Sequence, residues 1–156
     1  MNKWIVYLLI LAAIPVLGFG GFGGEDVGKL YPVQAVMISP DKEGLRILTD
    51  GGQCGWGKDV NAAMENLNAT SSERVFLDTA DYLLLELGTE DWLPQLKQYL
   101  RPSCSVCYAS NQVDLEEAAL YLQLHQPELT LTQYEAGQRE LSTLIYNEGR
   151  MTLVRS

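Results

Sequence analysis

The first 24 residues constrain the fold of this chain more than any other stretch, because they are almost entirely apolar. The run from Trp4 to Gly24 (WIVYLLILAAIPVLGFGGFGG) contains 21 residues and no charge, and a membrane-spanning helix needs about 20 apolar residues. Lys3 precedes the run, which predicts a cytoplasmic N-terminus. Residues 1–24 are therefore predicted to be a transmembrane signal anchor in the cell membrane, with the following domain outside the cytoplasm.

A cleaved signal peptide is the second interpretation of the same run. Its most apolar part, Ile5 to Leu17, spans only 13 residues, which is the length of a signal-peptide core. Cleavage would make the protein secreted. In both cases residues 25–31 are expected to form a flexible tether and residues 32–156 a single extracytoplasmic domain.

The charge of the part after residue 24 excludes one class of partner. This part holds all 20 acidic side chains and 10 of the 11 basic ones, for a net charge of −10. Such a surface repels phosphate backbones. Nucleic-acid binding is therefore not expected.

Beyond residue 32, short apolar runs alternate with helical patterns. Residues 33–39 and 45–49 predict two strands joined by a turn, which indicates a hairpin. In residues 60–68, apolar side chains recur at helical spacing behind Asp59, a good N-cap: Val60, Ala63, Met64 and Leu67.

The rest of the chain continues this alternation. Strands are predicted at 75–77, 82–87 and 103–110, helices at 91–100 and 115–126, and a closing hairpin around Glu148 and Gly149. Asp114 is placed to cap the second of these helices. The predicted fold class is α+β, a mixed β-sheet with about three helices packed on it.

The stretch GQCGWGKD at 52–59 partly matches a phosphate-binding P-loop. Gly52, Gly57 and Lys58 fit the pattern, but Asp59 replaces the hydroxyl that binds magnesium. The preceding strand also belongs to an antiparallel hairpin, whereas a P-loop follows a strand of a parallel sheet. We therefore interpret the stretch as a glycine-rich turn into a capped helix, and we predict no cofactor.

Cys104 and Cys107 form a C-x-x-C motif that could be a redox pair or half of a metal site. The motif lies in a predicted strand, where side chains three apart point to opposite faces. Cys54 could instead pair with either cysteine. A zinc site needs four ligands and His125 is the only histidine, so no metal is predicted. An envelope thiol–disulfide protein that uses these cysteines remains the alternative function.

Two further sets of residues suggest other functions. Asp78 and Asp81 lie between apolar runs and could act as a hydrolytic pair if they faced each other across a cleft. Aromatic side chains often anchor protein interfaces, and three are candidates for this role: Trp56, Trp92 and Tyr134. No catalytic residue is assigned.

The order of the pieces resembles the N-terminal domain of the Ger(x)C family of spore germination proteins. Its pattern G-x-x-x-x-x-A-x-x-x-L occurs here as Gly57, Ala63 and Leu67. An apolar strand ending in Glu86 and a helix leading to Arg101 follow in the same order. The other corresponding pieces are residues 33–39, 104–109, 115–124 and 144–154.

The resemblance covers about 120 residues and implies a reduced, stand-alone relative of that first domain. The family is anchored by a lipid on a cysteine after its signal peptide, and residues 1–24 contain no cysteine. The resemblance implies a non-enzymatic envelope protein that contacts other membrane proteins, within a sporulation or germination assembly. It carries over no catalytic residue.

Overall fold

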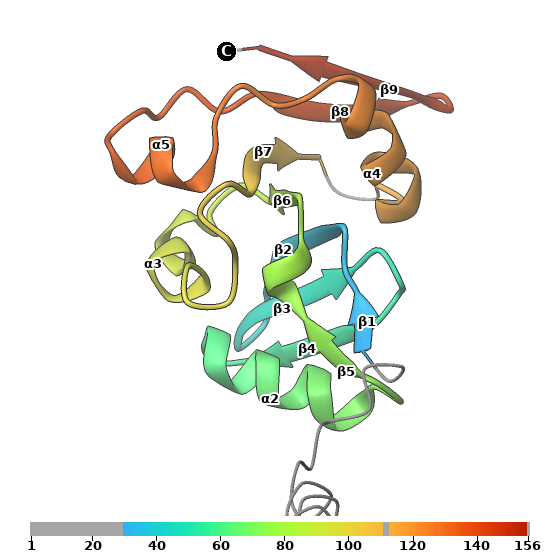
Figure 1. Ribbon diagram of the computed structural model, residues 1–156, viewed down its shortest axis with the longest axis vertical. Coiled ribbons are helices and arrows are strands. Elements are labelled where there is room, and N and C mark those ends of the chain that lie inside the picture. The colour runs from blue at the N-terminus through green and yellow to red at the C-terminus, as the bar shows by residue number, and fades with distance from the viewer. Residues whose placement is uncertain (1–29, 111–112, 156) are drawn as a thin grey trace, which may run out of the picture.

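A seven-stranded mixed sheet forms the centre of the computed structural model, which describes residues 30–110 and 113–155 (Figure 1). Its strand order is β4-β3-β2-β6-β7-β8-β9. The strands are β2 (Ala35–Asp41), β3 (Gly44–Thr49), β4 (Cys54–Gly57), β6 (Tyr82–Leu85), β7 (Ser105–Ala109), β8 (Thr143–Asn147) and β9 (Arg150–Val154). A separate parallel pair joins β1 (Leu30–Pro32) to β5 (Arg74–Phe76).

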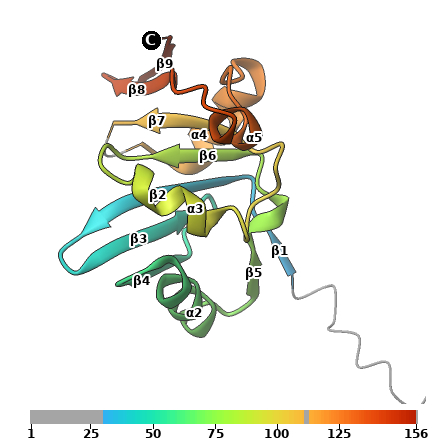
Figure 2. The same cartoon turned by 90° about the vertical axis from the view of Figure 1, so that its left-hand side faces the viewer.

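Parallel pairing is confined to the middle of the sheet. Strands β2, β6, β7 and β8 run in the same direction, as the arrows of β6 and β7 show in Figure 2. Antiparallel strands lie outside them, β3 and β4 on one side and β9 on the other. The sheet is therefore mixed, as predicted.

Four α-helices cover the two faces of this sheet in the described residues. They are α2 (Val60–Thr70), α3 (Leu93–Leu96), α4 (Leu115–Leu124) and α5 (Leu131–Glu135). Residues of α2, α3 and α5 share one hydrophobic cluster, and those of α4 belong to a second. Short 3-10 turns at Leu77–Thr79 and Glu90–Trp92 complete the helical segments.

The two clusters lie on opposite faces of the central strands. In β6, Leu83 and Leu85 belong to the first cluster, whereas Tyr82 and Leu84 belong to the second. Alternate residues of a strand point to opposite faces, and a sheet covered on both faces needs apolar residues at every position. This requirement explains why the run YLLL shows no polar alternation.

The helix α2 packs directly against the backbone of β4. A Cβ atom at Gly55 would lie 2.3 Å from the carbonyl oxygen of Ala63, and one at Gly57 would lie 2.5 Å from the amide nitrogen of Ala63. Both distances are shorter than real Cβ contacts, so only glycine allows the helix to approach this closely. The side chain of Asp59 caps the helix by accepting from the Ala62 N–H at 2.8 Å.

The α+β class, both predicted hairpins and the two aspartate caps are confirmed. The interpretation of residues 52–59 as a turn alone is wrong, because residues 54–57 form strand β4. Residues 30–110 and 113–155 contain four α-helices rather than about three, since α5 has only five residues and is too short to show a helical period. The predicted helix at 91–100 shortens to a 3-10 turn and α3.

The predicted signal anchor, residues 1–24, lies outside the described residues, and the predicted tether ends in β1. In the described part of the chain, no helix is both long and apolar enough to cross a membrane.

Replacing Gly55 with alanine tests the close contact between α2 and β4. We expect Gly55→Ala to lower the free energy of unfolding by about 3 kcal/mol, because the new methyl group collides with helix backbone that cannot move aside. Gly52→Ala is the matched control. Gly52 has a φ of +77° with open space around it, so only backbone strain of about 1–2 kcal/mol is expected. If urea unfolding showed that both variants lose the same free energy of unfolding, the close packing of α2 on β4 would be contradicted.

Candidate interaction surface

The three cysteines are free thiols. Cys104 is buried in the cluster beneath α2, α3 and α5, whereas Cys107 is buried in the cluster beneath α4. Burial raises the pKa of both thiols to about 12, so neither is a thiolate near neutral pH. Cys54 is half-buried on β4. This arrangement offers no accessible pair of sulfurs for thiol–disulfide exchange.

Neither Asp78 nor Asp81 lines one of the four cavities found beside the described residues. Asp81 forms an ion pair with Arg101, whose Nε also donates to the carbonyl of Ala80 at 3.1 Å. Asp78 is exposed in the 3-10 turn before β6. Arg101 therefore ties the end of the α3 segment to the start of β6, and this contact gives the arginine of the family-like pattern a structural role.

Of the three candidate interface aromatics, only Trp56 is well exposed, at 51%. It lies on β4 opposite Arg46 and lines a cavity of about 340 Å³ with charged residues of the β2–β3 turn. Trp92 is half-buried against the first cluster, and Tyr134 is buried in it at 8% exposure. Tyr134 is therefore a core residue, which leaves Trp56 as the surface candidate among the three.

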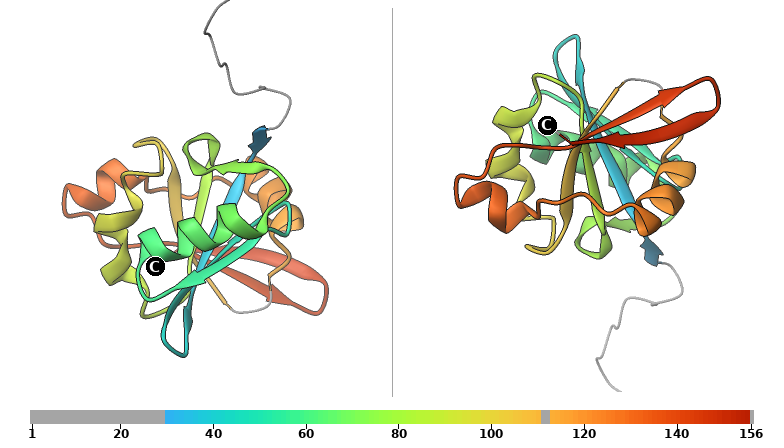
Figure 3. Two further views of the ribbon diagram at one scale, coloured as in Figure 1. Left: turned by 90° about the horizontal axis from the view of Figure 1, so that it is seen from below. Right: turned by 90° about the horizontal axis from the view of Figure 1, so that it is seen from above.

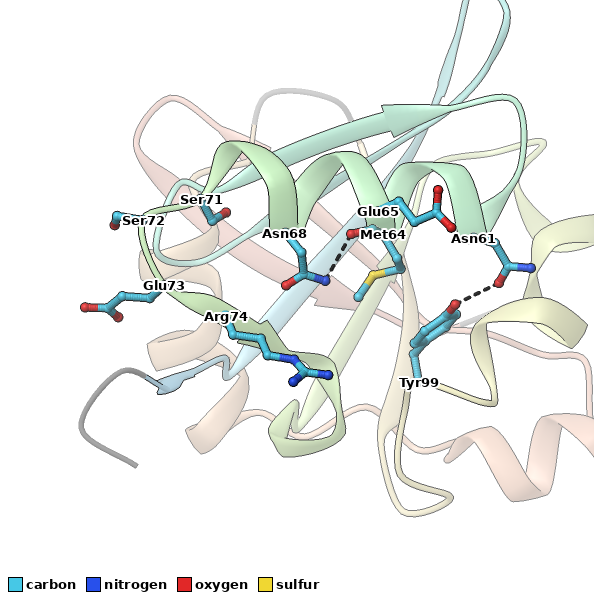
Figure 4. Close-up of a pocket in the computed structure, with 9 residues that line it drawn as sticks. All are labelled: Asn61, Met64, Glu65, Asn68, Ser71, Ser72, Glu73, Arg74 and Tyr99. Atoms are coloured by element: carbon cyan, nitrogen blue, oxygen red, sulfur yellow. Dashed lines mark hydrogen bonds between the residues drawn. The ribbon is translucent and has the colours of Figure 1, made fainter. Parts of the chain in front are cut away.

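A cavity of about 620 Å³ lies beside α2 (Figure 4). Its principal polar groups are bound within the chain. The Tyr99 hydroxyl donates to Asn61 Oδ1 at 2.7 Å. The Asn68 amide donates to the Met64 carbonyl and accepts from the Val75 N–H, both at 3.0 Å. These bonds fix the end of α2 to β5, so the cavity is lined by groups that stabilise the fold.

A polar network lies between α3 and α5, beside a cavity of about 310 Å³. Burial alone would raise the pKa of Glu90, but hydrogen bonds from backbone N–H groups and from the Tyr108 hydroxyl lower it. Burial and the bond to Glu90 raise the pKa of Tyr108 to about 12. At neutral pH Glu90 is thus charged and Tyr108 neutral, so neither is suited to exchange protons in catalysis.

The outer edge of the sheet at β4 is closed by side chains of α2. The Trp56 N–H donates to Asn66 Oδ1 at 3.2 Å, and the Cys54 carbonyl accepts from the Thr70 hydroxyl at 3.4 Å. Unpaired edge groups attract strands of other chains, and natural sheets often cover them. Here the helix α2, which follows β4 in the chain, provides the cover.

The opposite edge, at β9, is covered much less. The β8–β9 hairpin turns through Glu148 and Gly149, both with positive φ, as two-residue hairpin turns require. Asn147 pairs with Arg150, and hydrogen-bonded pairs alternate along such a ladder. The backbone groups of Met151 and Leu153 therefore point away from β8. One of them is occupied, because the Leu153 N–H donates to the Tyr121 hydroxyl at 3.2 Å.

The β8–β9 hairpin also exposes apolar side chains on both faces. Of the seven exposed large apolar residues in the described part of the chain, three belong to it: Ile145 (39%), Tyr146 (40%) and Val154 (45%). In both views of Figure 3 the hairpin projects beyond the rest of the sheet. A projecting hairpin with apolar faces and a free edge is the best candidate for an interaction surface in the described residues.

The sequence carries one signal for this surface. The strand RMTLV has no proline and no lysine, two residues that often protect an edge. Without knowledge of the strand order, however, β9 could not be recognised as an edge. Neither a family model, nor a curated protein, nor a solved structure matches this chain.

Alkaline unfolding tests the burial of the thiols. The unfolded chain loses its thiol protons near the ordinary pKa of 9.0, whereas folded Cys104 and Cys107 keep theirs up to about pH 12. Because the unfolded state then binds fewer protons, stability must fall as the pH rises from 9 to 12. We expect Cys107→Ala to flatten this decline by up to about 1.4 kcal/mol per pH unit.

Cys54→Ala is the control, since the pKa of this half-buried thiol is raised less than those of the two buried thiols. Urea unfolding at several pH values measures all three proteins. If Cys107→Ala and Cys54→Ala changed the slope of the unfolding free energy against pH equally, the burial of Cys107 would be contradicted.

Proposed function

We propose that this protein is a non-enzymatic binding protein of the bacterial envelope, anchored in the membrane by residues 1–24, with the β8–β9 hairpin as its contact surface. Its partners are other envelope membrane proteins, and the domain lies outside the cytoplasm. The observation that carries the proposal is the exposure of Ile145, Tyr146 and Val154 on one projecting hairpin. Water-exposed apolar groups of this size gain free energy when a partner covers them.

The resemblance to the Ger(x)C N-terminal domain supports the same proposal and suggests a sporulation or germination assembly. The positions that carry the resemblance have structural roles here. Gly57 and Ala63 meet where α2 packs on β4, and Arg101 binds Asp81. These family-like positions therefore stabilise the fold. This is compatible with a protein that acts through its surface rather than through these residues.

The thiol–disulfide alternative receives no support from the positions of the sulfurs. Cys104 and Cys107 belong to different hydrophobic clusters, and burial keeps both thiols protonated. A redox pair needs two adjacent sulfurs, at least one of them an accessible thiolate. We therefore propose binding as the function.

Site-specific photocrosslinking in the native cells tests the proposal. The full chain carries benzoylphenylalanine either at Tyr146 on the hairpin or at Trp56 on the opposite side of the sheet. The two sites are matched, since both are aromatic and are 40% and 51% exposed. We expect a discrete adduct with one membrane protein from position 146 and none from position 56.

Two results would argue against the hairpin as the contact surface. The first is an adduct formed from position 56 but not from position 146, which would assign binding to the β4 side. The second is the absence of a discrete adduct from either position, which would leave the exposed hairpin without a binding role.

A further inference from the structure

The free edge of β9 restricts what kind of partner the hairpin can bind. The backbone groups that point outward belong to Met151 and Leu153, two residues apart, or about 7 Å along a strand. An extended chain presents its own N–H and C=O groups at this same interval, whereas a helix does not. The spacing of the outward backbone groups on β9 therefore fits the backbone of an added strand.

We infer that the β9 edge binds an extended segment of another protein as an eighth strand, and that a carboxylate of this segment lies beside Arg150. The inference rests on the proposed function and names the chemistry of the partner. Strand addition of this kind draws its affinity from backbone hydrogen bonds and its specificity from neighbouring side chains.

Side chains beside the edge indicate the composition of the segment. Met151 and Leu153 are half-buried and pack against the α4 cluster, so side chains of the added strand on that face would be apolar. On the other face, Val154 is exposed and Thr152 is small and uncharged. A strand with apolar or uncharged side chains on both faces therefore fits along most of its length.

The charge of Arg150 indicates the last feature of the bound segment, an acidic side chain. Arg155 binds Glu128, Lys97 binds Glu135 and Arg101 binds Asp81. Within residues 30–110 and 113–155, by contrast, no ion pair includes Arg150. It shares a face with Thr152 and Val154, so a carboxylate on that face of an added strand would meet it. Such a pair fixes register and selects among partners more than it adds affinity.

A second copy of this chain fits the edge less well. Two β9 strands related by a two-fold axis at Thr152 would place Arg150 opposite Val154 of the second copy. Arg150 would stay without an acidic partner, and two domains of net charge −10 would be brought together. The charges therefore favour a different protein as the source of the strand.

Tyr121 limits access to the edge. Its hydroxyl accepts from the Leu153 N–H at 3.2 Å, and an added strand must displace it before it can bind that N–H. Removing the hydroxyl while keeping the ring should therefore tighten binding, by roughly threefold to tenfold for one hydrogen bond. A purely structural role for Tyr121 would give no such gain.

Peptide binding to the full chain in detergent tests the inference. The probe is a fluorescent nine-residue peptide in which valine alternates with threonine and one central threonine is glutamate. Its twin carries lysine at that position. We expect the glutamate peptide to bind roughly fivefold more tightly, Arg150→Glu to reverse this preference, and Tyr121→Phe to strengthen binding.

Two variants at position 151 separate backbone from side-chain effects. Met151→Pro removes an outward N–H without affecting the ladder to β8, so it should abolish peptide binding. Met151→Ala removes the side chain but keeps the N–H, so it should retain most of the binding.

Four results would overturn the inference. Equal binding of the two peptides would show that Arg150 does not select a carboxylate. Unchanged peptide binding by Met151→Pro would show that the peptide does not add as a strand. Self-association that Met151→Pro abolishes would make a second copy the occupant. If neither peptide bound while position 146 still formed its adduct, the proposed function would stand and strand addition would be wrong. If that adduct were also missing, both would fail.

Discussion

The contact between α2 and strand β4 is the constraint on which the rest of the sheet depends. Gly55 and Gly57 bring the helix against the strand backbone, and at this distance Asn66 and Thr70 reach the outward groups of β4. The same glycines therefore pack the helix and close the edge. Larger residues would displace the helix, expose the edge and leave Val60, Ala63, Met64 and Leu67 without their partners.

Closure of one edge makes the sheet asymmetric. The parallel strands in the middle are buried on both faces, and the β4 side is covered by a helix, whereas β9 forms part of a projecting hairpin (Figure 3). Evolution tends to cover edges that have no partner, because free edges promote aggregation. Among residues 30–110 and 113–155, only the Tyr121 hydroxyl binds an outward backbone group of β9, and this openness directs the proposed binding function to β9.

Local patterns in the sequence predicted the elements whose signals are contained within a few residues. Asp59 and Asp114 marked helix starts, and Glu148 with Gly149 marked the hairpin turn. Strand β4 and helix α5 were missed for physical reasons. Strand β4 consists of C-G-W-G, and glycine is unfavourable in strands unless a neighbour must come close, which only the tertiary structure shows. Helix α5 is a single capped turn, too short for a period to appear.

The candidate surface could be predicted only in part. The opposite placement of Cys104 and Cys107 followed from strand geometry, and the fold shows it. Trp56 is exposed as an interface residue should be, but Tyr134 fills the core because α5, which was not foreseen, carries it inward. The open edge depended on strand order, and strand order arises from contacts between residues far apart in the chain. No local pattern contained it.

Amide hydrogen exchange of the full chain, followed residue by residue by NMR, tests the asymmetry of the two edges most directly. We expect the Trp56 amide, bound to Asn66, to exchange slowly, while the outward Met151 amide exchanges at nearly the rate of an unprotected peptide. Equal protection of both amides would contradict the account, since it would mean that the β9 edge is already covered.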